Sequence, residues 1–144
     1  MVDNKIRNKA EREQFLAEPQ AAALSVSLGA ARGPLTVPIW YQYAPGGEPW
    51  VLTAAGSRKA KSIEEAGFFS LMVQRLEPTR RYVAVEGAVS RIEPATDEQI
   101  VELTYRHISG DAAKRHIKFL HSLGEHLAIF MRPQHWLYSD EESF

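Results

Sequence analysis

The sequence predicts a mainly β, α+β protein in which six short strands form a small barrel with flanking helices. The first observation behind this prediction is a series of short apolar segments, several with two-residue alternation, separated by turns rich in Gly and Pro. The second is a set of helix-start signals at several points along the chain. The third is a length of 144 residues, 44% of them hydrophobic, without a dividing linker. We therefore expect residues 1–144 to form one domain with a substantial core.

The first third of the chain predicts one helix and three strands. A helix ends before Pro19, and an apolar strand covers residues 22–28. A second strand over residues 34–43 alternates apolar and other side chains, and Pro38 within it indicates a bulge or a free edge. A turn rich in Gly and Pro then leads to a third strand, residues 50–54, which we expect to pair back on the second as a hairpin.

The middle of the chain predicts a short helix followed by two strands. The helix covers roughly residues 58–66, and Gly67 is placed to end it. An apolar run over residues 68–74 is typical of a buried strand. The next strand is long, residues 81–93, and Gly87 inside it indicates a bulge or a close approach of another backbone segment.

The last third predicts two helices and a final strand. The Thr-x-x-Gln spacing at Thr96 is that of a capping box and opens the first of these helices. The second helix starts near Asp111 and stops at Gly124. Residues 126–131 form the sixth and last predicted strand, and the tail beyond it carries Trp136.

Composition excludes several classes of function. The formal net charge of −1 gives no general attraction to nucleic acid or anionic membrane. The absence of Cys excludes disulfides and thiol catalysis, and no apolar run approaches the ~20 residues that cross a bilayer. The charged N-terminus lacks the apolar core of a secretory signal. We expect a cytoplasmic protein without nucleic-acid or membrane partners.

A basic segment after the third strand is the strongest candidate site. The strand ends in Thr53, and after a turn of small residues Ser57 is placed to cap a helix that begins with Arg58, Lys59 and Lys61. Cations are unfavourable at a helix N-terminus, whereas a phosphate there is stabilised by free N–H groups and by the helix dipole. Two interpretations stay open from the spacing alone: a solvated basic patch and a phosphate site.

The other polar and aromatic residue groups do not indicate a functional site. The five histidines lack the spacing that would converge three or four metal ligands, so we expect no metal site. No nucleophile elbow or carboxylate pair indicates a hydrolase. The three Trp residues fit the core or an interface better than a ring-stacking role.

The order of these motifs resembles one family. Residues 50–73 resemble the cofactor-phosphate segment of the pyridoxamine 5′-phosphate oxidase-like proteins, in which a strand ends in Thr and Ser-Arg-Lys opens a helix. Residues 34–43 resemble the strand that edges the flavin ring, and residues 81–92 resemble the family's "Y-V-x-V-E-G-x-A" strand. Residues 105–110, "YRHISG", resemble a turn between its late helices. The resemblance extends over about residues 11–138.

The resemblance implies a fold, a cofactor and a reaction. The fold is a six-stranded split β-barrel of the FMN-binding type, paired as a homodimer with two cofactor sites at the interface. The reaction is hydride transfer between the reduced cofactor and a small unsaturated or conjugated substrate. Three cations and a nearby cluster of Arg75, Arg80 and Arg81 favour the deazaflavin coenzyme F420, with its longer anionic tail, narrowly over FMN. A protein that binds a flavin or a tetrapyrrole without turnover is the alternative from a different class.

The resemblance also assigns residues to the cofactor: Thr53, Ser57, Arg58, Lys59, Lys61, Ile39, Trp40 and Tyr41. Arg58 and Lys59 would contact the phosphate, and Lys61 matches a position that is often basic in deazaflavin-binding members. No side chain is an obligatory acid or base, although Tyr41 or a water would serve as a proton source. The chain ends soon after Tyr138 without the Arg- and Trp-bearing extension of true pyridoxamine phosphate oxidases. The resemblance therefore does not extend to the vitamin B6 reaction.

Overall fold

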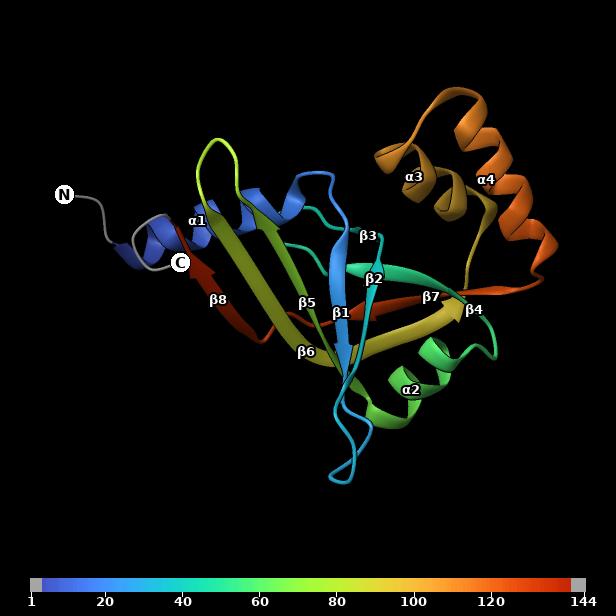
Figure 1. Ribbon diagram of the computed structural model, residues 1–144, viewed down its shortest axis with the longest axis horizontal. Coiled ribbons are helices and arrows are strands. Elements are labelled where there is room, and N and C mark those ends of the chain that lie inside the picture. Colours follow the sequence, from blue (N-terminus) through green and yellow to red (C-terminus); the bar gives the residue numbers. More distant parts are fainter. Residues whose placement is uncertain (1–3, 141–144) are drawn as a thin grey trace.

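The computed structural model describes residues 4–140 and is mainly β with four helices (Figure 1). Its elements, in chain order, are α1 (Asn4–Ala17), β1 (Ala22–Val26), β2 (Leu35–Ile39), β3 (Tyr41–Gln42), β4 (Trp50–Ala54), α2 (Arg58–Ala66), β5 (Phe68–Arg75), β6 (Arg81–Pro94), α3 (Asp97–His107), α4 (Gly110–Ser122), β7 (His126–Met131) and β8 (His135–Ser139). No helix within the described part of the chain is long and apolar enough to cross a membrane.

The strands form one curled antiparallel sheet in the order β2-β1-β5-β6-β7-β4-β3, with β8 paired to β6. The described residues therefore form eight strands, and the predicted number of six was wrong for two reasons. The expected single strand 34–43 is interrupted at Trp40, because β2 pairs with β1 whereas β3 pairs with β4. The tail around Trp136 forms β8, because β6 is long enough to offer it a second stretch of partners.

The two ends of the sheet are consecutive in the chain. β2 lies at one end of the strand order and β3 at the other, and Trp40 alone separates them in sequence. The curled sheet is therefore closed covalently at Trp40, while β2 keeps one edge without a strand partner among the described residues. This explains Pro38, which lacks a backbone donor and was predicted to need a bulge or a free edge.

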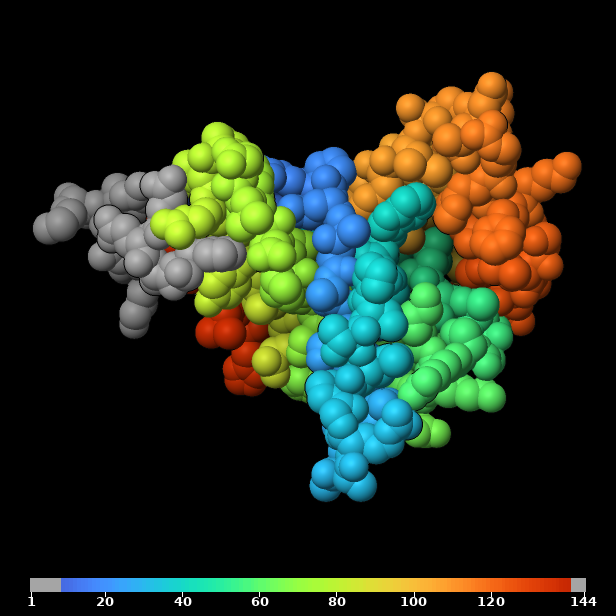
Figure 2. Space-filling view, in the orientation of Figure 1, coloured from blue at the N-terminus to red at the C-terminus, as the bar shows by residue number. Residues whose placement is uncertain are grey.

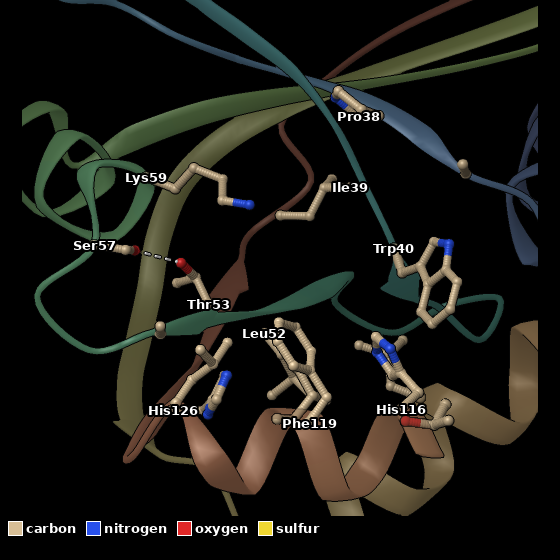
Figure 3. A pocket seen from close by; sticks show the side chains of 16 residues that line it. Pro38, Ile39, Trp40, Leu52, Thr53, Ser57, Lys59, His116, Phe119 and His126 are labelled. Carbon is tan, nitrogen blue, oxygen red and sulfur yellow. Dashed lines mark hydrogen bonds between the residues drawn. The ribbon is translucent and has the colours of Figure 1, made fainter. Parts of the chain in front are cut away.

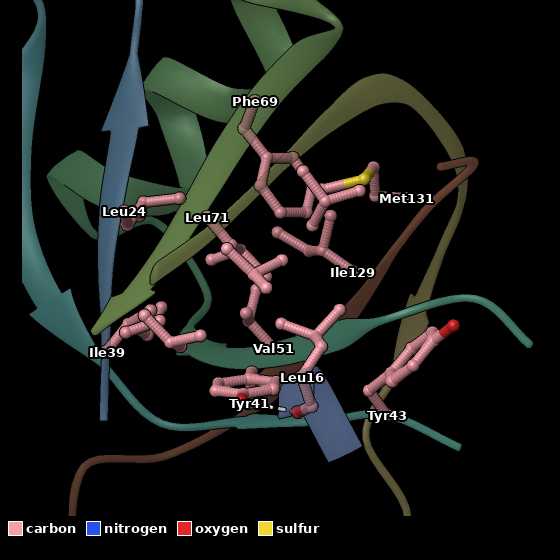
Figure 4. Close-up of a cluster of buried hydrophobic side chains, with 14 of the residues drawn as sticks. Leu16, Leu24, Ile39, Tyr41, Tyr43, Val51, Phe69, Leu71, Ile129 and Met131 are labelled. Atoms are coloured by element: carbon pink, nitrogen blue, oxygen red, sulfur yellow. Dashed lines mark hydrogen bonds between the residues drawn. The ribbon is translucent and has the colours of Figure 1, made fainter. Parts of the chain in front are cut away.

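The core fills the inside of the curled sheet and is closed at its ends by helices (Figure 4). Phe15 and Leu16 at the end of α1 are buried, and α2 contributes Ile63. The hydroxyl of the fully buried Tyr41 donates a hydrogen bond to the Leu16 carbonyl (2.6 Å), which fixes the end of α1 against β3. Each helix thus covers apolar side chains that the strands alone would leave in water.

Helices α3 and α4 lie together beside the barrel (Figure 1). A second apolar cluster joins α3 to the sheet, through Leu103 against Trp50 and Phe130. The capping box predicted at Thr96 is present, with both of its hydrogen bonds to Gln99. Ala113 is the one buried residue among those described in α4, which is therefore held mainly through α3.

A close crossing of two backbone segments explains the glycine inside β6. A Cβ atom at Gly87 would overlap the carbonyl oxygen of Arg132 and lie 2.8 Å from its carbonyl carbon. The same crossing is held by hydrogen bonds from the Arg132 N–H to the Ala88 carbonyl and from the Gln134 N–H to the Glu86 carbonyl, both 2.9 Å. The prediction of a close backbone approach at Gly87 is confirmed.

Replacing Gly87 with Ala should destabilise the fold by about 3 kcal/mol or more, because the added methyl group meets backbone atoms that cannot move aside as a side chain does. The measurement is urea unfolding followed by tryptophan fluorescence. The matched control is Gly33→Ala, where an added Cβ meets nothing within 4 Å, and a change under about 0.5 kcal/mol is expected. Equal stability of the two variants would contradict the crossing.

Candidate functional site

The N-terminus of α2 is shaped by the turn that precedes it. The Ser57 N–H donates to the Ala54 carbonyl (3.0 Å), and Gly56 between them takes a φ of 78°, which glycine adopts without strain. The Ser57 Oγ accepts the Ala60 N–H (3.2 Å), so Ser57 is the N-cap, as predicted. The Thr53 Oγ lies 2.8 Å from the Ser57 Oγ, and either hydroxyl can donate. Thr53 thus ties the end of β4 to the helix start.

The α2 N-terminus carries positive charge without an internal partner. In the part of the chain that the structure describes, the N–H groups of Arg58 and Lys59 have no hydrogen-bond acceptor. The first turn holds no acidic residue, and neither these two cations nor Lys61 forms an ion pair with a described residue. This arrangement fits an external anion better than it fits the isolated helix.

A pocket of about 490 Å³ opens between β2, β4, α2 and α4, and we call it the gap pocket. Figure 2 shows the corresponding hollow in the surface between the cyan, green and orange segments. Its lining residues are Ala21, Pro38, Ile39, Trp40, Leu52, Thr53, Ala54, Ser57, Lys59, Leu103, Thr104, His116, Phe119, Leu120, Leu123 and His126. In Figure 3, Ser57 and Lys59 lie at one end, and Trp40 and His116 lie at the other. The pocket therefore has a cationic end and an aromatic end.

The edge of β4 adds a backbone donor to the pocket. On its β7 side the Ala55 N–H donates to the Glu125 carbonyl (2.9 Å), and hydrogen-bonding directions alternate along an antiparallel strand. The N–H groups of Leu52 and Ala54 therefore point away from β7. Leu52 lies opposite Trp40 in the register of β3 and β4, whereas Ala54 lies beyond the end of β3 and has no described strand partner on that side. A flat ligand in the gap can therefore meet the Ala54 N–H as well as apolar side chains.

The family resemblance assigns eight residues to cofactor binding. Five of them line the gap pocket: Ile39, Trp40, Thr53, Ser57 and Lys59. Arg58 and Lys61 are exposed on α2 and do not line it, although both are close to Lys59 in the same helix. The charged group that reaches the pocket is therefore Lys59.

Tyr41 does not line the pocket. Its side chain is fully buried in the core, and its hydroxyl donates to the Leu16 carbonyl. Burial raises the pKa of this phenol, with smaller lowering effects from Gln20 and Arg106. The expectation that the Tyr41 side chain lies along a bound ring or donates a proton there is corrected, because alternation turns this side chain inward.

The cluster of Arg75, Arg80 and Arg81, expected near the phosphate site, lies at the turn between β5 and β6. Arg75 donates to a Glu18 carboxylate oxygen (3.1 Å) and lies over the Phe15 ring, and Arg81 lies over the same ring. This places them at the α1 end of the β5–β6 hairpin, whereas α2 precedes the other end of β5. The strand between them spans roughly 23 Å. The cluster does not join the gap pocket within one chain.

Sequence reasoning missed the contribution of α4. One stripe of this helix lines the pocket, with its members at positions i, i+3, i+4 and i+7: His116, Phe119, Leu120 and Leu123. That spacing is visible in the sequence. The spacing alone does not show whether this stripe faces the core or a cavity, because that depends on how α4 is held beside the sheet. Among residues 4–140, no three His, Asp or Glu side chains are grouped to hold a metal ion.

Two histidine rings contact Trp40, which lines the aromatic end of the pocket. The His107 ring lies parallel to the indole at 4.7 Å, and the His116 ring is tilted against it at 4.9 Å. Burial lowers the pKa of His107, against a smaller raising effect from the Tyr41 carbonyl 3.3 Å from its Nε2. Burial also lowers the pKa of His116, with a further lowering by His126. Both rings are therefore uncharged at neutral pH.

Comparisons with known proteins bear on the fold alone. A scan against protein-family models finds no match, and a search of curated proteins finds none. Among solved structures, an F420 reductase superposes with a TM-score of 0.66 at 19% identity, covering 87% of this chain and 94% of that one. An FAD- and haem-binding protein from Mycobacterium smegmatis gives 0.65 at 18% identity, covering 94% and 72%.

A third solved structure shares the same fold. It is a protein related to general stress protein 26, of the pyridoxinephosphate oxidase family, from Clostridium acetobutylicum. The TM-score is 0.63 at 10% identity, covering 96% of this chain and 90% of that one. The chain has the split-barrel fold of the pyridoxamine 5′-phosphate oxidase-like proteins. In this split barrel, the gap pocket lies where the two halves of the sheet separate, beside β2 and β4.

The lowered histidine pKa values predict how the stability of this split barrel changes with pH. Above a pH of about 6.5, the usual histidine value, both folded and unfolded chains hold neutral rings. As the pH falls below that value, the unfolded chain binds protons that folded His107 and His116 resist, so the free energy of unfolding decreases.

Urea midpoints between pH 7.5 and about 5 should therefore fall less in a His107→Gln variant than in the parent protein. The control is His135→Gln, because His135 is exposed on β8 and contacts neither Trp40 nor the gap pocket. If the urea midpoints of His107→Gln follow those of the parent at every pH, the pKa of His107 is not lowered in the folded protein.

Proposed function

We propose that the protein is an oxidoreductase that binds a phosphate-bearing flavin or deazaflavin coenzyme in the gap pocket and reduces a small unsaturated or conjugated substrate. The observation that carries this proposal is the difference between the two ends of the pocket. One end holds Lys59 beside the free N–H groups of α2, and the other holds Trp40 among apolar side chains. A coenzyme with an anionic phosphate and a flat ring system matches both ends.

The chemistry of the residues present fits such a group. The turn before Ser57 leaves the first N–H groups of α2 unpaired, and Lys59 adds a cation that no described carboxylate neutralises. Further along, the Ala54 N–H at the edge of β4 offers a backbone donor for the polar rim of a flavin-type ring. Arg58 and Lys61 extend the positive charge outside the pocket on the same helix.

Hydride transfer is the chemistry that the coenzyme would supply when bound. The chain's own residues position the ring and limit its access to solvent, with Ile39 and Trp40 on one side and Leu52 on β4. Because the Tyr41 hydroxyl is held in the core, we assign the accompanying proton to water rather than to this side chain.

Between the two coenzymes we favour the deazaflavin F420. An F420 reductase is among the structural neighbours, and Lys61 lies outside the pocket where an anionic tail beyond the phosphate would meet it. The arginine cluster at the end of the β5–β6 hairpin no longer supports this choice within one chain. FMN, which ends at its phosphate, is the alternative.

A second candidate function is binding of a flavin or tetrapyrrole without turnover. His116 and His126 line the pocket, and one neighbouring structure is an FAD- and haem-binding protein. A histidine nitrogen is a common haem ligand. Haem titration would favour this function if a Soret shift is lost in His116→Ala or His126→Ala and no acceptor is reduced by the protein with reduced coenzyme.

Replacing Lys59 with Ala should weaken coenzyme binding by about 1.5–3 kcal/mol, the range for a hydrogen bond to a charged group. Folding should change little, because Lys59 forms no ion pair with a described residue. The measurement is fluorescence titration of coenzyme-free protein with F420 and with FMN. Lys118→Ala is the control, since Lys118 is exposed on α4 outside the pocket. Unchanged affinity for both coenzymes in the Lys59 variant would refute the phosphate assignment.

The same titration distinguishes the coenzymes. The longer anionic tail should make F420 affinity fall more steeply with salt than FMN affinity, because exposed charge pairs are screened within a Debye length of ~8–10 Å. Lys61→Ala should weaken F420 and spare FMN. Tighter FMN binding with equal salt dependence would reverse the choice.

We further propose that two chains pair through the outer face of the sheet. Five paired positions cross this face on adjacent strands and form an apolar row: Pro38, Ala23, Met72, Ala84 and Leu137. Leu137 is 64% exposed, and the others are exposed or half-buried in the single chain. An apolar row in water favours a self-complementary contact. Because the row begins at Pro38, which lines the gap pocket, a partner there would adjoin the site.

Light scattering after size-exclusion chromatography should report about twice the chain mass of 16.2 kDa. Met72→Glu, at the middle of the row, should shift the protein to monomer because a carboxylate is costly to bury. Leu76→Glu is the matched control, since Leu76 is 59% exposed in the β5–β6 turn and lies outside the row. A parent protein that is monomeric at micromolar concentration would rule out this pairing.

A further inference from the structure

The pocket-lining stripe of α4 is apolar but is not buried by the fold. Phe119 is 56% exposed and Leu123 is 51% exposed, although both line the gap pocket. An apolar stripe of a surface helix ordinarily faces the core. Here α4 packs on α3 through Ala113, and its second apolar face is turned toward the open pocket. That face needs an occupant which the chain itself does not supply.

The phosphate end of the pocket does not explain this face. Ser57 and Lys59 lie at the opposite end from Trp40 and His116 (Figure 3). Lys59 is the one Lys, Arg, Asp or Glu side chain among the lining residues, so the α4 wall contains no carboxylate, ammonium or guanidinium group. Burial lowers the pKa of its histidine, His116, which is therefore uncharged at neutral pH. A charged ligand would therefore gain nothing from this wall and would lose hydration.

His116 is the polar group of the wall and has a fixed position. Its ring is held 4.9 Å from the Trp40 ring, and it forms no hydrogen bond with another described residue. A neutral imidazole presents one N–H donor and one acceptor nitrogen. Held beside an apolar wall, it can donate a hydrogen bond to a carbonyl oxygen and stabilise negative charge that develops there, without itself being protonated.

We infer that the α4 stripe of His116, Phe119 and Leu123 is the substrate-specificity wall of the enzyme, selecting an uncharged, flat, apolar compound with a conjugated carbonyl group. The inference rests on the proposed function. Phe119 and Leu123 cover the apolar part of the substrate, and the His116 N–H donates to its carbonyl oxygen. In the reduction, the substrate accepts a hydride from the reduced coenzyme and a proton from water, and the coenzyme leaves oxidised by two electrons.

The test uses a naphthoquinone and its sulfonate as a matched pair of acceptors that differ in charge. The full chain, loaded with reduced F420 or reduced FMN, is assayed for quinone reduction to the hydroquinone, and coenzyme affinity is measured separately by fluorescence. Phe119→Lys should raise the KM for the naphthoquinone roughly tenfold, the scale of discrimination in an apolar pocket. It should lower the KM for the sulfonate and leave coenzyme affinity unchanged.

Val101→Lys is the matched control, since Val101 is 42% exposed on α3 and does not line the pocket. It should change neither KM. His116→Phe should reduce kcat at least about tenfold through loss of the donor, and His116→Gln, which keeps an N–H donor, should recover most of it. A structural role alone would not produce that recovery.

Three other outcomes would contradict the inference, and each can be distinguished from the others. Unchanged KM values in Phe119→Lys would show that the α4 stripe does not contact the substrate. A parallel loss of coenzyme affinity would assign the stripe to the coenzyme, and a change in molecular mass would assign it to a subunit interface. If the parent binds neither coenzyme, the proposed function fails by itself. Quenching of tryptophan fluorescence by the naphthoquinone then tests the wall, and equal quenching in Phe119→Lys and Val101→Lys would refute it.

Discussion

The fold and the candidate site both depend on the point where one extended segment changes its pairing partner. Before Trp40 the segment pairs with β1, and after Trp40 it pairs with β4. The change closes the sheet through the chain itself, and it also leaves β2 and β4 facing each other without hydrogen bonds between them. A fully paired barrel would fill this space with ladder hydrogen bonds. The pocket exists because the two strands separate here.

The electrostatics of the site follow from the same local geometry. The turn after β4 places the start of α2 beside the open gap, so the helix dipole and Lys59 act at one end of it, with Arg58 and Lys61 exposed nearby on the same helix. Each cation near a helix N-terminus costs about 0.3–1 kcal/mol when exposed at low ionic strength. The chain carries this cost without an internal carboxylate nearby in the first turn. At the opposite end, apolar walls and neutral rings provide no charge, and this polarity orients any ligand that is anionic at one end.

The sequence was sufficient where the determining contacts are local. The helix over residues 58–66 could be predicted with its bounds because Ser57 caps it three residues from Ala60 and Gly67 ends it. The proposal of a phosphate site at its N-terminus rests on the same few residues. The break at Trp40 could not be predicted, because it reflects competition between partners distant in the chain. Likewise β8 depends on pairing with β6, and the role of His116 depends on how α3 holds α4 against the pocket.

The weak anchoring of α4 has a consequence for how this protein can diversify. A side chain that stabilises the fold and also contacts a ligand can rarely change, since each substitution alters both properties. In α4 different residues stabilise the fold and line the pocket. Ala113 is buried, whereas Phe119 and Leu123 are about half exposed to solvent. Substitutions along the exposed stripe leave the barrel core untouched. The pocket wall can therefore vary between proteins of this fold at little expense in stability, while the α2 turn stays under a separate constraint.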